Sequence, residues 1–480
     1  MAIETMILIG VAVYLVVMIG IGYYASRGSH SLVDFVVAGR NMPLWLCSVT
    51  IFATWFGSGT MMGAATAAYE FDRLLMLSEP FGSAVALLLT GLFFARILRR
   101  TRRITWPEII QSRFGKLAGT ISAGADLLSA IIWLGGILFT FGVLLESLTG
   151  APMAVGIFGG LFVVVVYTMI GGMWAVALTD FVQMLIFVIG MLVLLVVVLN
   201  EAGGWGAIVA QLPDGAMNPL PTDAGIWDWI DTIHVFMAMG LAAVASNSVI
   251  QRGLSARSEH VARNAFNIAA IAYTILGIVP LMLGFAASVL LPDLDDPNAV
   301  LTDLAIVYLH PVLTALFIGA ILSAIMSTSD SIMLSASTII STNFLPLIKR
   351  HPDEQLRLLV ARWSIPIVGL ISTYIAFNAS RVVEVLLDSV AVLLASMIAP
   401  FIACFWWNMA NRSGALAGMV AGFIAWRVAA AMSMSFPPDL FGFCVSVVAL
   451  VVVTLVTQTI DPPRPLTDID GNPMALKDRL

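Results

Sequence analysis

Long apolar stretches alternate with short polar segments over almost the whole chain. The stretches at residues 6–23, 181–199 and 265–291 contain no charged residue. A helix needs about 20 apolar residues to cross the hydrocarbon core of a bilayer. On that scale the pattern predicts thirteen membrane-spanning helices, at residues 5–25, 43–70, 76–97, 118–148, 152–171, 176–200, 230–252, 264–291, 309–343, 357–378, 383–408, 414–433 and 438–458. The sequence therefore predicts an all-α polytopic membrane protein.

Composition supports the same class of protein. The chain is 60% hydrophobic and 11% charged, whereas soluble proteins carry about 25% charged residues. The three cysteines, Cys47, Cys404 and Cys444, lie in apolar surroundings without paired spacing, so neither a disulfide framework nor a metal site is predicted. No basic residue precedes the first apolar stretch, which is typical of a retained helix and not of a signal peptide.

Most Lys and Arg residues gather in four segments, at residues 96–116, 252–263 and 349–362 and at Arg412. All four fall on one side of the membrane if thirteen spans are counted. The segments 201–231 and 292–303, on the other side, contain several aspartates but no Lys or Arg. By the positive-inside rule the basic side is cytoplasmic. We therefore expect a multi-pass protein of the inner (plasma) membrane, with its N-terminus outside and residues 461–480 as a short cytoplasmic tail.

Two of the predicted spans contain small and polar residues that interrupt the apolar pattern. One carries "WFGSGTMMGAA" at 55–65, and the span five positions later carries "MGLAAVASNSVIQRG" at 239–253. Such residues allow a helix to break in the membrane where the freed backbone faces protein or a cavity. They also occur where helices simply pack closely. The five-span offset favours broken helices, because transporters built from two repeats carry them at matching positions.

The stretch "ILSAIMSTSDSIMLSAST" at 321–338 places an acid, Asp330, among many hydroxyls. A charge at the bilayer centre costs at least about 2.5–3.5 kcal/mol, so it usually lines a pathway or has a partner. Ala324, Ser327, Thr328 and Ser331 share one helix face at i, i+3, i+4 and i+7. Oxygen ligands of this kind suit a hard cation. Serines elsewhere in the stretch are equally well explained by bonds to their own helix.

Five motifs in this order resemble those of the sodium/solute symporter family. They are "DFVVAGRNMP" (34–43), "ITWPEIIQSRFG" (104–115), "GGMWAVALTDFVQ" (171–183), "QRGLSARS" (251–258) and the hydroxyl stretch. The resemblance implies a LeuT-like core of two inverted five-helix repeats, at about 43–200 and 230–408. One transporter domain would then cover residues 1–460, with extra helices at 5–25, 414–433 and 438–458. Within the family, "FATWFGSGTMMG" is most similar in wording to the high-affinity choline transporters.

The resemblance also implies the residues that bind the coupling ions. The shared sodium ion of the family maps onto the backbone carbonyls of Ala53, Phe56 and Ala324 and the hydroxyls of Ser327 and Thr328.

A further cation site of some family members maps onto Asp180, Asp330 and Ser331, with the acid Asp330 where those members have a hydroxyl. Two neighbouring carboxylates either hold a cation or share a proton. Asp180, the other acid that we expect within the membrane, has the alternative of pairing with an arginine of the cytoplasmic loops.

The solute is indicated by two tryptophans. Trp55 adjoins the first break, beside Gly59, and Trp133 lies on another span; both match aromatic positions of the choline transporters. Aromatic faces bind quaternary ammonium groups. Two further aromatic positions of those transporters are occupied here by Val244 or a neighbour and by Ser83. The candidates are therefore choline or another organic amine, with a proline-like amino acid or an organic acid as the alternative.

Other classes of protein fit the sequence less well. No repeated filter loop supports an ion channel, and the short tail has no room for a signalling domain. No catalytic grouping, histidine cluster or nucleotide fingerprint supports an enzyme. We expect sodium as the coupling ion and no other cofactor, a small-molecule solute and the bilayer as partners, and no nucleic acid. The oligomeric state and the number of sodium ions stay open.

Overall fold

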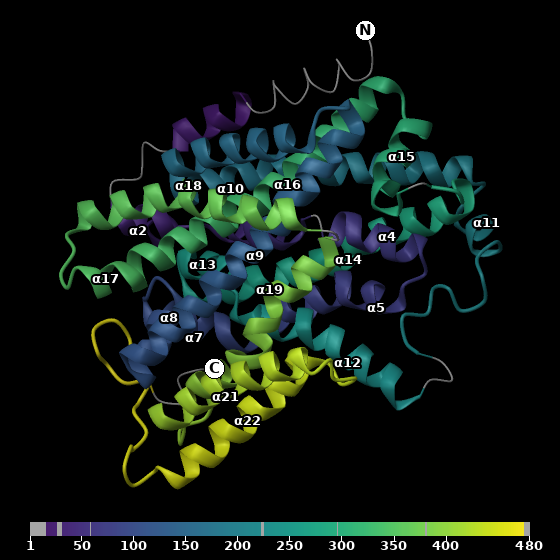
Figure 1. The fold of residues 1–480 in the computed structure, drawn as a ribbon. Coiled ribbons are helices and arrows are strands. Elements are labelled where there is room, and N and C mark those ends of the chain that lie inside the picture. Colours follow the sequence, from purple (N-terminus) through teal and green to yellow (C-terminus); the bar gives the residue numbers. More distant parts are fainter. Residues whose placement is uncertain are drawn as a thin grey trace.

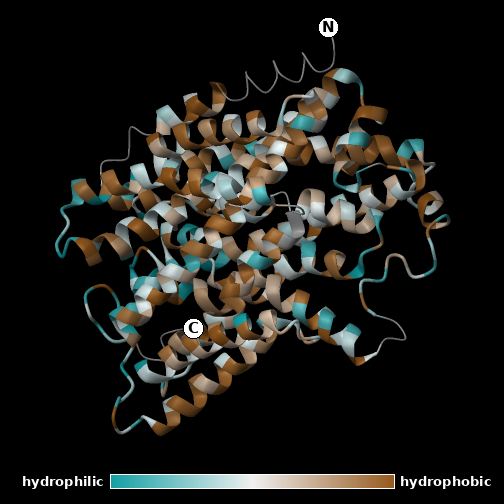
Figure 2. Cartoon of the chain, viewed as in Figure 1, coloured by the Kyte–Doolittle hydropathy of each residue, from teal (hydrophilic) through white to brown (hydrophobic). Residues whose placement is uncertain are grey.

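The computed structural model describes residues 16–25, 31–57, 59–221, 225–294, 296–379 and 382–474. These residues form long helices joined by short connections (Figure 1), and apolar residues predominate along the helices while hydrophilic ones gather in the connections (Figure 2). The first predicted span, 5–25, is described only from Val16 to Ala25, which is helical. Residues 5–15 and the end of the tail lie outside the described residues.

The first half of the chain contains five helical segments in the order expected for one repeat. The elements are α3 (Leu44–Trp55) with α4 (Ala64–Tyr69), α5 (Arg73–Met76) continued by α6 (Ser83–Leu89) and α7 (Ala95–Thr101), α9 (Lys116–Thr149), and α10 (Met153–Glu201), which holds two of the five. Shorter helices connect them at α2 (Leu32–Val37), α8 (Trp106–Phe114) and α11 (Trp205–Val209).

The second half repeats this order. The elements are α12 (Ile226–Gly240) with α13 (Asn247–Ser255), α14 (Glu259–Leu290), α16 (Pro311–Ile339) with α17 (Leu345–Ile348), α18 (Glu354–Asn378), and α19 (Val382–Ser396) with α20 (Ile398–Trp406). A short helix, α15 (Val300–Tyr308), precedes α16. The last two helices, α21 (Arg412–Ala431) and α22 (Pro438–Val456), lie side by side at one edge of the bundle (Figure 1).

The number of spans agrees with the prediction once one long helix is divided. Within the described ranges, nine helices are long and apolar enough to cross a membrane, and two bent pairs make eleven. The 49-residue helix α10 holds both predicted spans 152–171 and 176–200, which makes twelve. They meet at Gly172, whose φ of 58° favours glycine and where a Cβ would overlap the Phe35 backbone. Val16–Ala25 belongs to the thirteenth.

Both predicted helix breaks are present. The axes of α3 and the segment Gly59–Tyr69 differ by 60°. The chain leaves α-helical geometry between α12 and α13, where Ala242–Ala245 form a short 3-10 turn. A third break was not predicted: α19 and α20 meet at 49°.

The basic segments converge at one end of the bundle. Arg99 Nε donates to the Ala256 carbonyl at 2.6 Å, and Arg100 pairs with Glu259 at 2.5 Å. The Leu32 N–H bonds Glu354 at 3.2 Å. The tail contacts the same end of the bundle, since the Ile469 N–H bonds the Thr101 carbonyl at 3.0 Å. Segments that the sequence predicted on one side of the membrane are thus in contact.

Candidate functional site

The neighbouring helix α14 donates a hydrogen bond to the backbone at the break after α3. Phe56 leaves helical geometry with φ −74° and ψ 59°. The Trp55 carbonyl accepts hydrogen bonds from the Gly57 N–H at 2.7 Å and from the Tyr273 hydroxyl at 3.1 Å. A Cβ at Gly57 would overlap the Thr328 hydroxyl, so glycine is required for this approach. The break therefore lies directly against α16.

The residues predicted to bind sodium meet at this contact. The Ser327 hydroxyl lies 2.8 Å from the Ala324 carbonyl and 3.4 Å from the Ala53 carbonyl. The Thr328 hydroxyl lies 3.5 Å from the Ala324 carbonyl. Phe56 is fully buried next to Gly57. Hydroxyl and carbonyl oxygens from two helices therefore converge, and hard oxygen ligands of this kind fit an alkali cation.

The second predicted group lies about one turn further along α16, where the Ser331 hydroxyl bonds the Ser327 carbonyl at 2.8 Å. The Asp330 carboxylate accepts a hydrogen bond from Tyr167 at 2.6 Å and one from Ser331 at 3.1 Å. Asp180 accepts one from Thr50. Both acids are fully buried, and they are close enough for their charges to interact.

Arg252 is the residue of this group that the sequence analysis misplaced. We predicted it in a cytoplasmic loop, but it is fully buried in α13. Its guanidinium donates to Ser331 and, at 2.5 Å, to the Ser248 carbonyl, and its charge interacts with those of Asp180 and Asp330. The reason is the helix break, which moves the start of α13 into the bundle and carries the arginine with it. A buried charge needs such partners.

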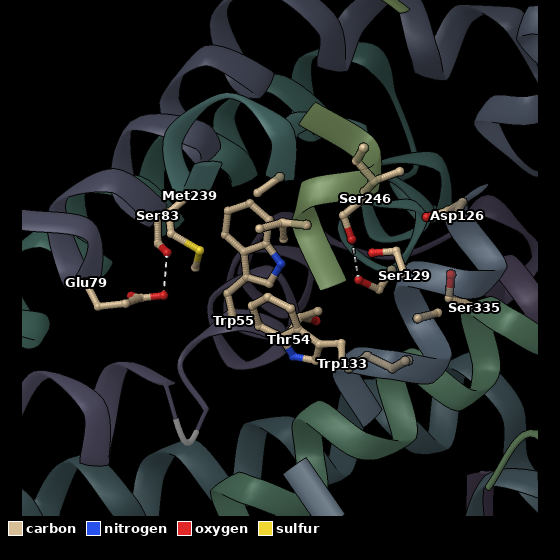
Figure 3. A pocket seen from close by; sticks show the side chains of 16 residues that line it. Thr54, Trp55, Glu79, Ser83, Asp126, Ser129, Trp133, Met239, Ser246 and Ser335 are labelled. Atoms are coloured by element: carbon tan, nitrogen blue, oxygen red, sulfur yellow. Dashed lines mark hydrogen bonds between the residues drawn. The ribbon is translucent and has the colours of Figure 1, made fainter. Parts of the chain in front are cut away.

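A cavity lies beside the break (Figure 3). Both tryptophans that were predicted to contact the solute line it. The lining residues are Thr54, Trp55, Glu79, Ser83, Asp126, Ser129, Ala130, Trp133, Met239, Ala243, Ser246, Ser248, Ile332, Ser335, Val390 and Leu393. The cavity thus combines aromatic faces, hydroxyls and carboxylates.

The other residues that the sequence placed at the solute site are Val244 or a neighbour, Gly59 and Ser83. Ala243 lines the cavity, whereas its neighbour Val244 is buried at 2% exposure and is not among the lining residues. The 3-10 turn after α12 turns the Val244 side chain elsewhere. Gly59 lines a smaller adjoining cavity, together with Glu79. Ser83 lines the main cavity.

Two acids of the cavity were missed by the sequence analysis, which expected only Asp180 and Asp330 within the membrane. Glu79 and Asp126 lie inside the predicted spans 76–97 and 118–148. Figure 3 shows them at opposite sides of the cavity, with Trp55 between them. Their signal was available, since an acid inside an apolar span is costly and points to function.

Asp126, which lies on α9, accepts hydrogen bonds from two other elements. Its carboxylate accepts hydrogen bonds from the Trp106 indole at 3.1 Å and from the Asn247 N–H at 3.4 Å. Asn247 is the first residue of α13, so the negative charge lies at the positive end of that helix. Asp126 therefore links α8 and α13 to the wall of the cavity.

Comparison with known proteins agrees with this arrangement. The family model described as the sodium:solute symporter family matches residues 35–422. The high-affinity choline transporter 1 of Drosophila melanogaster is 27% identical over 76% of this chain and 61% of its own length. The osmoregulated proline transporter OpuE of Bacillus subtilis is 25% identical over 94% of this chain and 95% of its own length.

A solved structure shows the same fold. A sodium-coupled sialic acid symporter in its substrate-bound, outward-open state superposes with a TM-score of 0.82, covering 95% of this chain and 98% of that one at 21% identity. The predicted LeuT-like fold class is confirmed. The chain belongs to the sodium:solute symporter family. Its members are transporters and not enzymes.

Proposed function

We propose that this sodium-coupled symporter carries a small organic cation, with choline and other organic amines as the first candidates. The observation that carries the proposal is the lining of the main cavity. It contains two acids, Glu79 and Asp126, and two tryptophans, Trp55 and Trp133, while no Lys, Arg or His lines it in the described part of the chain. Carboxylates and aromatic faces both attract cations.

Sodium is proposed to bind at the carbonyls of Ala53, Phe56 and Ala324 and the hydroxyls of Ser327 and Thr328. These ligands belong to two elements, α3 with its break and α16. An ion that bridges both favours the conformation in which they lie together. Because Trp55 follows Ala53 by two residues and lines the cavity, sodium binding would also hold one wall of the solute site. This is the physical basis of coupling in our proposal.

The group of Asp180, Asp330 and Ser331 is proposed to bind a cation that the protein itself supplies, the Arg252 guanidinium. Support comes from the hydrogen bond between Arg252 and Ser331 and from its interaction with both carboxylates. In this arrangement the second group stabilises the bundle, and the first group alone couples sodium to transport.

Residues 1–460 are proposed to form one transporter domain of the inner (plasma) membrane. The end of the bundle where the basic segments meet would face the cytoplasm, by the positive-inside rule. The N-terminus would then lie outside and the tail inside.

An amino acid is the second candidate solute, because the aligned Bacillus relative is a proline transporter. The cavity lining disfavours it. A carboxylate of the solute would enter a site with two acids and without a basic residue among those that line it.

Uptake into proteoliposomes tests the proposal. The full chain is reconstituted, and labelled choline, ethanolamine, proline, a sugar and a carboxylate are offered with and without an inward sodium gradient. We expect gradient-dependent uptake of an amine and none of the carboxylate. Uptake of proline alone would replace the organic cation by an amino acid, and uptake indifferent to sodium would contradict the coupling.

A further inference from the structure

Glu79 is held in place by hydroxyl groups from three parts of the chain. One oxygen accepts a hydrogen bond from Ser83 at 2.8 Å. The other accepts one from Thr60 at 2.8 Å and lies 3.1 Å from the Tyr273 hydroxyl. Hydrogen bonds from hydroxyl groups fix the orientation of a carboxylate. The residues that carry these hydroxyls lie on α6, on α14 and in the helix break.

The same carboxylate borders both cavities. Glu79 lines both the main cavity and the smaller adjoining one. No Lys, Arg or His lines either cavity in the part of the chain that the structure describes. A carboxylate offers about four acceptor positions, and three hydroxyls surround this one. At least one position is therefore left for a donor within the cavity.

The opposite end of the main cavity has a different character. Ser129, Ser246, Ser248 and Ser335 line it next to Asp126. The Ser246 and Ser248 hydroxyls lie 2.9 Å apart. Asp126 itself already accepts from Trp106 and Asn247. This end therefore offers hydroxyl groups that bond a neutral polar group, while Glu79 offers the charge.

We propose that Glu79 determines the solute specificity by accepting a hydrogen bond from an ammonium N–H, so that the preferred solute is a protonated primary or secondary amine that carries a hydroxyl group at its other end. This inference rests on the proposed transport of an organic cation and narrows it. A quaternary ammonium presents only methyl groups to the carboxylate. A quaternary ammonium would therefore leave an acceptor position of the Glu79 carboxylate unpaired. Sites built to accept a hydrogen bond from an N–H discriminate strongly against analogues that lack it.

Ethanolamine and choline are the matched probes, because they share one skeleton and differ only in the three N-methyl groups. Binding is measured on the purified full-length protein in sodium buffer by titration calorimetry. We expect ethanolamine to bind at least about tenfold more tightly than choline. Glu79→Gln keeps the shape and removes the charge, and should weaken ethanolamine binding about tenfold or more. It should weaken choline binding by a clearly smaller factor, because choline loses the attraction of the charge but no hydrogen bond. Glu70→Gln, the same change at an exposed position, should leave both unchanged.

The outcomes separate this inference from the proposed function. If the wild type binds choline at least as tightly as ethanolamine, the role of Glu79 is overturned and organic-cation transport stands. If Glu79→Gln weakens the binding of both amines equally, at an unchanged melting temperature and sodium half-saturation, the role of Glu79 is likewise overturned and organic-cation transport stands. If proline binds and neither amine does, both proposals fall. If Glu79→Gln does not fold, Ser83→Ala is used instead, because it removes a hydrogen bond that orients Glu79. We expect it to reduce the preference for ethanolamine over choline, and an unchanged preference would overturn the inference.

Discussion

The hydroxyl of Ser327 lies 3.4 Å from the backbone carbonyl of Ala53, although the two residues are 274 positions apart in the chain. Ser327 is on the long helix α16, and Ala53 lies two residues before the end of α3, where the helix breaks. The contact joins the first helix of one repeat to the third helix of the other. It also brings the predicted sodium ligands to within a short distance of the solute cavity, because Trp55 belongs to the same break.

Removing either hydroxyl of the sodium site tests its assignment. Ser327→Ala and Thr328→Ala should each raise the half-saturating sodium concentration several-fold, because each removes one of five proposed ligands. The measurement is sodium-dependent uptake at saturating solute. Ser329→Ala is the matched control, since the Ser329 hydroxyl bonds its own helix at the Ile325 carbonyl, 3.1 Å away. Unchanged sodium dependence in both variants would refute the assignment.

Arg252→Gln tests whether Arg252 or a second sodium ion is the cation of the buried group. Removing the guanidinium leaves the two buried acids Asp180 and Asp330 without a compensating charge, which we expect to destabilise the protein by roughly 3–5 kcal/mol. The melting temperature should fall, and the Hill coefficient for sodium should stay the same. Adding Asp180→Asn should restore part of the stability, because only one uncompensated acid then remains. A lower Hill coefficient in Asp180→Asn alone, at normal stability, would instead indicate a second sodium ion.

The aromatic walls of the cavity should contribute to cation binding. Trp55→Leu and Trp133→Leu should each weaken binding of an amine by about 1–2 kcal/mol, roughly tenfold in affinity, and phenylalanine should be milder. Trp45→Leu serves as a control, because Trp45 is 53% exposed and packs edge-on against Phe181 at 5.3 Å. Tryptophan fluorescence titration reports the affinities. Equal effects of all three variants would show that the walls supply packing and no specific attraction.

The contact between the tail and the basic segment should weaken in acid. The Asn472 side chain bonds Asp468 at 3.1 Å, and together with the Asn472 N–H and the arginines Arg102 and Arg103 it lowers the pKa of Asp468 below its ordinary value of 3.8. The folded tail therefore favours the carboxylate. The stabilisation that Asp468 gives to the turn of the tail and to its contact with Arg102 is present above about pH 4 and is lost as the pH falls through the lowered pKa.

Asp468→Asn should reproduce that loss at neutral pH. Hydrogen exchange of residues 461–474 should become faster, whereas Asp214→Asn, an exposed acid distant in sequence from the tail, should have no effect. If exchange in the tail is equally slow in both variants, docking does not depend on the Asp468 carboxylate and rests on other contacts, such as the bond from the Ile469 N–H to the Thr101 carbonyl.

Part of the candidate site could be predicted because its signal is local. Helical spacing places Ala324, Ser327 and Thr328 on one face whatever surrounds the helix. The glycines and small polar residues that permit a break are visible in the same way. The partner across the contact, Ala53, came only from the resemblance to a family, since spacing along one helix says nothing about a second.

The remainder of the site could not be read from spacing. Arg252 adjoins a basic segment in the sequence, yet the break before α13 places it inside the bundle between two acids. Glu79 and Asp126 are visible in the sequence as acids inside two apolar spans, but their position at one shared cavity depends on how the helices pack together. The bend between α19 and α20 was likewise not predicted, because the sequence there contains no glycine cluster.

The sequence by itself determined the membrane, the number of spans, the clustering of basic segments and the position of the hydroxyl face, because each depends on hydrophobicity and periodicity along a single segment. Tertiary structure alone decided which charges are buried together and which side chains face the cavity. The physical reason is that a helix fixes only the relative directions of its own side chains. Their surroundings are supplied by helices hundreds of residues away, as Ser327 and Ala53 illustrate.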